Sequence, residues 1–513
     1  MPPLPAHLRT RTRTRTRPEA DGGPVARCGR LSSTTKPGIR MDRTRIAIGG
    51  VILAVLLLLP AAAWGQAAIP ATPAGAVLEE WLTSFNAADE SRIAAFQRTY
   101  QRKTPVDEVL QQRRDTGGFT VVAMESLSPT ELKATLQEVD LPDSRILFEL
   151  KVESGSPSRI TALNVEALPV PRLDEAAALA AVVARADALA KRELFSGAVL
   201  VARDNQVLLE RAWGLADREK GTPNTVDTQY RLGSMSKIIT AVAALQLVEA
   251  GKLSLDVPIG AYLPDYPNKQ AAAKVSVRHL LTHRGGVGEI GFGESPEFKS
   301  PAEFIVRRDA MRTPSDYVRQ YAGQALAFEP GSRTEYSSLG FMVLGALIER
   351  LSGQSYYDYV QMHVYDVAGM DDTGSLPETM TVTHRAVGYM RQGESLVPNW
   401  DTLPYRGSPA GGGYSTVRDL LRFVQALQGG KLLSPAMVAE ATKLHSGWQG
   451  LGFEVVGDGA LASYGHGGMA PGMNAHLRIY PELDYVIVVV SNFDPPSAGL
   501  VYSFLHERIP VSN

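Results

Sequence analysis

The residues best suited to chemistry are a serine and a lysine three positions apart, Ser234 and Lys237. They lie where an extended run, residues 229–233, gives way to an apolar stretch that ends near Gly251. Residues three apart on a helix share one face, so the lysine amine can reach the hydroxyl. A serine needs a neighbouring base to become nucleophilic, and a buried lysine can serve. The pair predicts a nucleophilic serine at the start of a buried helix.

A tyrosine stands before a second apolar helix. Tyr336, followed by Ser337 and Ser338, precedes the apolar residues 340–348. A phenol can relay a proton if a nearby cation lowers its pKa, and a lysine would supply that cation. The alternative is a tyrosine that only packs at a helix entrance.

A glycine-rich stretch, residues 464–469, leads into a strand-like run at 475–480. Glycines let a strand backbone approach a substrate closely. A backbone N–H here, which we assign to Met469, can complete an oxyanion hole with the N–H of Ser234.

Taken together and in this order, the three motifs resemble the serine β-lactamase and penicillin-binding-protein superfamily, specifically the class C β-lactamase-like hydrolases. The resemblance covers residues 173–507 and includes the linking segments 277–283, 328–332 and 410–416. It implies that Ser234 is acylated, that Lys237 and Tyr336 activate it jointly, and that neither cofactor nor metal is needed.

Two positions depart from the family pattern. His466 stands where β-lactamases carry the lysine of their Lys-Thr-Gly motif, while Gly468 matches its glycine. Histidine is mostly neutral at pH 7, so it binds a substrate carboxylate less well than lysine does. Ser338 stands where an asparagine is common, and its shorter side chain reaches less far toward a substrate.

These departures favour an esterase or D-amino-acid peptidase over an efficient β-lactamase. The expected function is an exported serine hydrolase that cleaves an ester, amide or β-lactam through an acyl-enzyme on Ser234. The alternative is a catalytically weak, penicillin-binding-protein-like binder of peptide or cell-wall ligands.

Two histidines four apart, His279 and His283, could be mistaken for a zinc pair. The zincin pattern needs a glutamate directly after the first histidine, and the chain has a leucine there. We expect helix-packing histidines near the active-site wall and no metal.

The elements that position these motifs predict an α+β protein. Residues 173–510 should form a β-lactamase-like domain, with an antiparallel sheet flanked by helices and an all-helical lobe. A hairpin at 197–202 and 206–213 should pair in that sheet with the strand 485–490. Residues 72–168 should form a small α+β accessory domain, since an amphipathic helix at 76–88 precedes several β-rich runs.

The beginning of the chain is expected to direct export. Residues 41–67 combine a short basic region, an apolar run at 46–59 and small residues, which is typical of a signal peptide. We expect a periplasmic or secreted protein, tethered to the membrane only if the leader stays uncleaved. Residues 1–40 carry an Arg-Thr repeat and are expected to lie upstream of a true start at Met41. Binding of nucleic acid or anionic lipid is the alternative for this basic prefix.

Charge and cysteine content narrow the partners. Residues 1–45 hold 11 of the 52 Lys and Arg and 3 of the 54 Asp and Glu, which leaves 41 basic against 51 acidic residues. Such an acidic chain argues against nucleic-acid partners and leaves a small-molecule or peptide substrate. The single cysteine, Cys28, lies in the prefix, so we expect no internal disulfide.

Overall fold

The computed structural model describes residues 67–141, 143–155, 157–290 and 308–511. The basic prefix 1–40 and the leader 41–67, apart from its last residue, lie outside these ranges, so the expectations about them stay predictions. Within the described ranges, none of the helices has the length and apolar character of a membrane span.

Residues 73–167 form three helices followed by a four-stranded antiparallel sheet in the order β1-β2-β3-β4. On β2 the alternate residues Leu132, Ala134 and Leu136 are buried, because successive side chains on a strand point to opposite faces. They share a core with Val77 and Leu78 of α1. The bounds are α1 Pro73–Ala87, α2 Glu90–Thr99, α3 Val106–Thr116, β1 Phe119–Ser128, β2 Glu131–Glu138, β3 Arg145–Val152 and β4 Ile160–Ala167.

A six-stranded antiparallel sheet organises the rest of the chain, in the order β13-β14-β15-β16-β5-β6. Strands from the two ends of this region meet at its centre, where β16 pairs with β5. The predicted hairpin and C-terminal strand are therefore confirmed. The bounds are β5 Gly197–Arg203, β6 Gln206–Trp213, β13 Glu454–Val456, β14 Ser463–Ala470, β15 Met473–Tyr480 and β16 Tyr485–Ser491.

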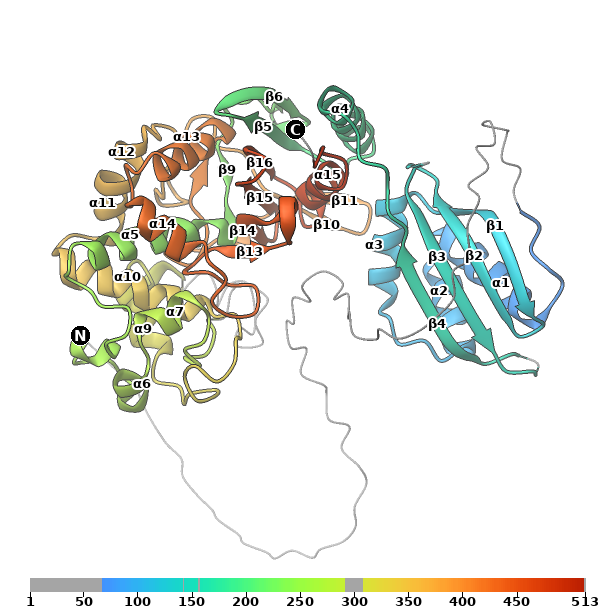
Figure 1. Cartoon of the computed structure of the whole chain (residues 1–513), viewed down its shortest axis with the longest axis horizontal. Coiled ribbons are helices and arrows are strands. Elements are labelled where there is room, and N and C mark those ends of the chain that lie inside the picture. The colour runs from blue at the N-terminus through green and yellow to red at the C-terminus, as the bar shows by residue number, and fades with distance from the viewer. Residues whose placement is uncertain (1–66, 142, 156, 291–307, 512–513) are drawn as a thin grey trace, which may run out of the picture. The chain divides into compact units, whose positions relative to one another are not determined.

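Both faces of this sheet are covered by helices (Figure 1). Leu200 and Val488 pack into the core shared with the helical lobe, whereas Val199 and Val489 pack against α4 (Glu175–Lys191) and α15 (Ser497–His506). Central strands that are buried on both faces read as continuous apolar runs, as β16 does. The fold is α+β, as expected.

The helical lobe lies between β9 and β13 in sequence and holds the apolar helices α5 and α10, which contact each other. The helices are α5 Lys237–Glu249, α6 Lys269–Lys274, α7 Val277–Leu281, α9 Pro314–Tyr321, α10 Ser338–Ser352, α11 Tyr356–Val360, α12 Asp366–Ala368, α13 Val417–Gln428 and α14 Pro435–Ala441. Short turns are η1 Gly233–Ser236, η2 Ile259–Ala261, η3 Gln361–Tyr365, η4 Trp400–Thr402 and η5 Gly459–Leu461. Three small ribbons pair β7 Leu215–Asp217 with β8 Thr222–Pro223, β9 Tyr230–Arg231 with β12 Tyr414–Ser415, and β10 Tyr389–Gln392 with β11 Ser395–Pro398.

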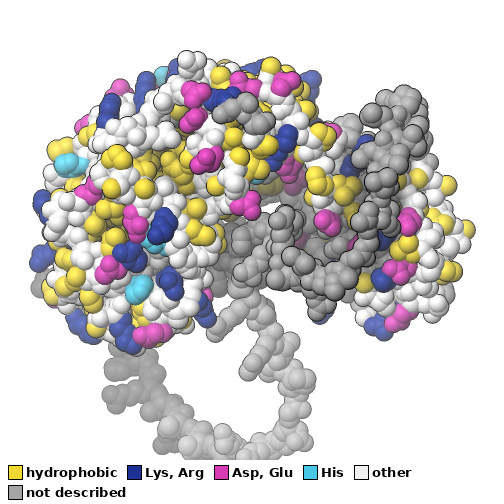
Figure 2. All heavy atoms as spheres, in the orientation of Figure 1, with side chains coloured by type: hydrophobic (Ala, Val, Ile, Leu, Met, Phe, Trp, Pro, Cys, Tyr) yellow, Lys and Arg dark blue, Asp and Glu magenta, His cyan; other side chains and the backbone are white. Residues whose placement is uncertain are grey.

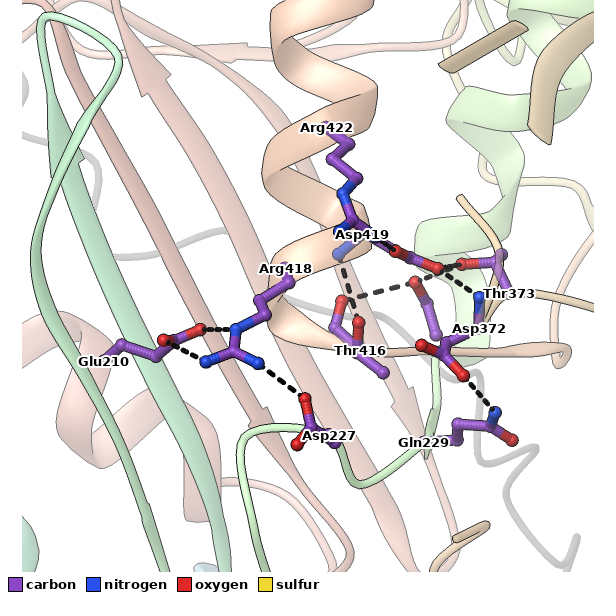
Figure 3. A network of polar contacts seen from close by, with 10 residues as sticks. Glu210, Asp227, Gln229, Asp372, Thr373, Thr416, Arg418, Asp419 and Arg422 are labelled. Atoms are coloured by element: carbon purple, nitrogen blue, oxygen red, sulfur yellow. Dashed lines mark hydrogen bonds and ion pairs between the residues drawn. The ribbon is translucent and has the colours of Figure 1, made fainter. Parts of the chain in front are cut away.

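A polar network fixes the beginning of α13 (Figure 3). Thr416 caps the helix by accepting the N–H of Asp419 at 3.1 Å. The fully buried carboxylate of Asp419 accepts hydrogen bonds from Thr373 at 2.8 Å and from the N–H of Asp372 at 2.8 Å, and pairs with Arg422 at 2.7 Å. Every carboxylate oxygen of this buried acid therefore has a partner.

Acidic and basic side chains are interspersed over the face of the molecule seen in Figure 2. No large area of that face carries one sign of charge alone. Among the described residues of that face, no basic stripe of the kind used in nucleic-acid binding is visible.

Candidate active site

Ser234 lies in the short turn η1, directly before α5 begins at Lys237. The α-helix therefore begins three residues later than expected, because the serine occupies a tight 3-10 turn. Gly233 has φ +53°, and a Cβ there would lie 3.0 Å from the backbone nitrogen of Met469. Glycine is needed here for its backbone conformation and for the close approach of β14.

Lys237 is completely buried, with its Nζ 3.4 Å from the Oγ of Ser234. The amine also donates to the carbonyl oxygen of Ala410. Burial lowers the pKa of Lys237 to about 7, although the carboxylates of Glu289 and Glu454 oppose the shift. Near neutral pH much of this lysine is therefore an uncharged amine that can accept a proton from the serine.

The loop that follows Ala410 is hydrogen-bonded to the serine turn. Gly412 donates its N–H to the carbonyl of Gly233 at 3.0 Å, and Gly412 accepts a hydrogen bond from the hydroxyl of Ser236. Leu232 donates to the carbonyl of Gly413 at 3.1 Å. The loop thus orients both the serine turn and the lysine.

Tyr336 lies directly before the capped start of α10, where Ser337 accepts the N–H of Gly340 at 3.0 Å. Its ring centroid is 4.7 Å from the Nζ of Lys237, and its hydroxyl interacts with the side chain of Ser234. Burial raises the pKa of Tyr336 above its ordinary value of 10, although the interaction with Ser234 opposes this. The prediction that a cation lowers this pKa is therefore wrong, because desolvation of the phenolate dominates.

The glycine-rich segment forms the β-strand β14, as expected. Its neighbour β13 pairs only with residues 463–465, so the strand beyond His466 has an edge toward the serine turn. A Cβ at Gly468 would lie 1.9 Å from the carbonyl oxygen of Leu232. Asn474 supports this stretch by donating to the carbonyl of Gly468 at 3.1 Å. The backbone nitrogen of Met469 thus lies close to Gly233, the residue before Ser234, while the Met469 residue is 51% exposed.

His466 is buried, with its Nδ1 bonded to the carbonyl of Gly467 and 3.7 Å from Glu454. Glu454 also pairs with Arg478 and accepts the N–H of Gly467 at 3.2 Å. Burial lowers the pKa of His466, and the opposing effect of Glu454 does not reverse it. His466 is neutral at pH 7, and the charge of Arg478 is matched by Glu454.

Ser338 is buried at the first position of α10. Its N–H donates to the carboxylate of Glu289 at 3.1 and 2.8 Å. Glu289 also interacts electrostatically with Lys237 and Tyr336. The structure therefore gathers Ser234, Lys237, Tyr336, Ser338, His466, Gly468 and Met469, all of the predicted site residues, around one serine turn.

Four further residues at this site were not predicted as functional: His283, Glu289, Trp448 and Glu454. His283 stacks on Tyr336, with ring centroids 4.5 Å apart, whereas His279 takes part in the capping box of α7. Only His283 had a signal in the sequence, since it ends the family-like segment 277–283.

Comparison with known proteins agrees with this geometry. The Beta-lactamase family model matches residues 179–505. The chain is 33% identical over 298 residues to "Esterase EstB" of Burkholderia gladioli, which covers 53% of the chain and 75% of that protein. It is 28% identical over 332 residues to "Penicillin-binding protein 4" of Amycolatopsis lactamdurans, which covers 60% of the chain and 84% of that protein.

A solved structure, that of a penicillin-binding protein from Bacillus halodurans, has the same fold. It superposes with a TM-score of 0.55 at 28% identity and covers 63% of this chain and 98% of its own. The family match covers the sheet, the helical lobe and the serine turn. The chain therefore belongs to the beta-lactamase family.

Proposed function

We propose that this protein is a serine hydrolase that cleaves a neutral ester or amide through an acyl-enzyme on Ser234. The carrying observation is the fully buried Lys237, whose amine lies 3.4 Å from the serine hydroxyl and whose pKa is lowered to about 7. A buried lysine at this distance has the two properties that a general base requires, geometry and a matched pKa.

In the proposed acylation, the Oγ of Ser234 bonds to the carbonyl carbon as its proton passes to Lys237. The N–H groups of Ser234 and Met469 stabilise the oxyanion. The bond to the leaving group then breaks as that group takes the phenolic proton of Tyr336, which recovers a proton from Lys237. A raised phenol pKa suits this role, because the hydroxyl stays protonated at neutral pH. Water repeats the sequence and releases the acid from Ser234.

The charges on β14 and β15 favour a substrate without a carboxylate at this strand. His466 is neutral, and Arg478 is paired with Glu454. A β-lactam presents a carboxylate that would find no free cation on these two strands. The relative named as an esterase is in keeping with this preference. We expect ester or amide turnover to exceed β-lactam turnover.

The second candidate is a weakly catalytic binder of peptide or cell-wall ligands. One observation favours it: a relative of similar coverage is named as a penicillin-binding protein. Against it, serine, lysine and tyrosine are all present and in contact.

Export is part of the proposal and depends on the leader in residues 41–67. A periplasmic or secreted hydrolase would meet small-molecule or peptide substrates and would need no cofactor. The small α+β domain at 72–168 and the hydrolase domain at 173–510 are proposed as its two folded parts.

Intact-mass spectrometry tests the chemistry. The protein is incubated with an activated p-nitrophenyl ester or with a penicillin, alongside Ser234→Ala. Ser236→Ala is the matched control, since it disturbs the same turn but keeps the proposed nucleophile. An adduct or turnover with the ester that survives in Ser236→Ala and disappears in Ser234→Ala supports the proposal. Equal labelling of Ser234→Ala contradicts the nucleophile, and stable labelling by penicillin without turnover favours the binder.

A further inference from the structure

His283 follows α7 by two residues and adopts a conformation that is uncommon for residues other than glycine. Its φ is +54°, in the left-handed region, and it is 1% exposed. A residue other than glycine in this region carries a conformational cost that the surrounding structure must offset. The contacts of His283 must offset this cost.

Three contacts from His283 surround Tyr336. The carbonyl of His283 accepts the N–H of Glu335 at 2.9 Å, and its Nδ1 accepts the N–H of Ser337 at 3.1 Å. Its ring stacks on the ring of Tyr336 at 4.5 Å, with 27° between the planes. One residue therefore holds the tyrosine through both of its chain neighbours and through its side chain.

The hydrogen bond from Ser337 fixes the protonation state of this ring. An Nδ1 that accepts a hydrogen bond leaves the proton of the neutral imidazole on Nε2. Burial lowers the pKa of His283 well below 6.5, and the neighbouring Lys237 and His466 lower it further, while Glu454 opposes them. The ring is thus a neutral acceptor for Ser337 throughout the neutral pH range.

Two further rings limit the movement of this pair. Phe341 lies 5.2 Å from the His283 ring, and Trp448 lies 6.0 Å from His283 and 6.4 Å from Tyr336. The plane of the phenol is therefore set from one side by His283, while its hydroxyl reaches Ser234.

We propose that His283 is a positioning residue for acylation, which holds the phenol of Tyr336 against Ser234 and Lys237. This inference rests on the proposed function, because it needs Tyr336 to transfer a proton. A displacement of a catalytic group by about 1 Å can cost about a hundredfold in rate. Loss of the contacts that hold Tyr336 should therefore lower the acylation rate measurably. A histidine that only fills the core would change stability alone.

Two variants separate the contacts. His283→Asn keeps an acceptor for Ser337 and tolerates the left-handed conformation, but it removes the stacked ring. His283→Phe keeps a ring and removes the acceptor. His279→Asn and His279→Phe are matched controls, because His279 lies four residues earlier and its side chain takes part in the cap of α7 rather than in a contact with Tyr336.

The measurement is the acylation rate constant per titrated active site, with a p-nitrophenyl ester. We expect about a hundredfold loss in His283→Phe, a smaller loss in His283→Asn, and less than about twofold in either control. Counting active sites removes any contribution from misfolded protein. Unchanged rates in both His283 variants would overturn the proposal.

The same variants in a Tyr336→Phe background test whether His283 acts through the tyrosine. If it does, each His283 substitution costs less than about twofold once the phenol is absent, because residues that act as a unit are not additive. Full additivity would contradict the proposal, and His283→Asn decides the question if His283→Phe does not fold. A wild-type protein that shows neither a Ser234 adduct nor turnover would instead refute the proposed function.

Discussion

Two buried polar clusters of this molecule differ in how far their polar atoms have hydrogen-bond partners. At the start of α13, the buried carboxylate of Asp419 has partners for all of its oxygens (Figure 3). Around Ser234, by contrast, the buried Nε2 atoms of His283 and His466 have no partner among the described residues. Lys237 lies in the second cluster, and burial lowers its pKa to about 7.

This difference separates a structural cluster from a reactive one. Buried polar groups are ordinarily satisfied, and the two unpaired imidazole nitrogens belong to residues around the proposed nucleophile, although unpaired buried atoms such as the Oε1 of Gln229 occur elsewhere in the described residues. The Asp419 network keeps its charges and rigidifies the start of a helix. Around Ser234, both histidines are neutral at pH 7 and burial lowers the pKa of Lys237 to about 7, while the charged Glu454 and Arg478 pair with each other.

The largest expected effect breaks the reactive cluster. Lys237→Met preserves much of the side-chain volume and removes the amine. Acylation per active site should fall by about 10²–10⁴-fold, the usual contribution of a general base. Stopped-flow release of p-nitrophenol measures it, and Lys252→Met, in the exposed turn that follows the same helix, is the control. A loss below tenfold would remove Lys237 from the base role.

The same substitution has a signature in stability. The folded pKa of Lys237 is below its unfolded value, so the unfolded chain binds more protons between about pH 7 and 10.5. Stability should therefore rise with pH above 7 in the wild type, and this slope should be smaller in Lys237→Met. Urea unfolding at pH 7 and pH 9 compares them, and equal slopes would contradict a lowered lysine pKa.

The pH dependence of acylation sharpens the comparison further. Lys237 must be unprotonated to accept the serine proton, so the rate should fall about tenfold per pH unit well below its pKa of about 7 and level off above it. Single-turnover rates from pH 5.5 to 9 measure this limb. A limb near pH 10 would show an ordinary lysine.

A smaller effect is expected from the structural cluster. Asp419→Asn places an amide where Thr373, Asp372 and Arg422 all donate, which should cost about 1–3 kcal/mol of unfolding free energy. Acylation per active site should stay within about twofold, since the network does not touch Ser234. Urea denaturation and active-site titration test both statements. A large change in the acylation rate would show that the Asp419 network also acts on the Ser234 site.

The smallest effect is expected at the exposed ion pair of Asp227 and Arg418, which Figure 3 also shows. Asp227 pairs with Arg418 at 2.7 Å, but its side chain is 59% exposed. Asp227→Asn should change the unfolding free energy by less than about 1 kcal/mol, as exposed ion pairs do. The same denaturation experiment applies, and a cost equal to that of Asp419→Asn would show that burial does not explain the difference.

The sequence predicted what depends on local pattern. The hairpin of β5 and β6 and the strand β16 follow from apolar alternation and apolar runs, and Ser234 and Lys237 from their spacing. The short pairing of β13 with β14, which brings Glu454 to His466, joins residues that no periodicity links. The wrong pKa shift of Tyr336 has a similar cause, because desolvation depends on the packed structure rather than on the neighbouring charge. The role of His283 depends on a turn conformation that its sequence does not encode visibly.

The close approach of β14 to the serine turn has a consequence for altering substrate range. A Cβ at Gly468 would clash with the carbonyl of Leu232, and Gly233 combines a left-handed φ with a tight contact to Met469, so neither position is suited to diversification. Met469 is different, because the proposed site uses its backbone N–H while its side chain is exposed to solvent. Any residue except proline supplies that N–H. Position 469 is therefore a suitable position for a saturation library that varies the surface beside the serine turn while retaining the donor.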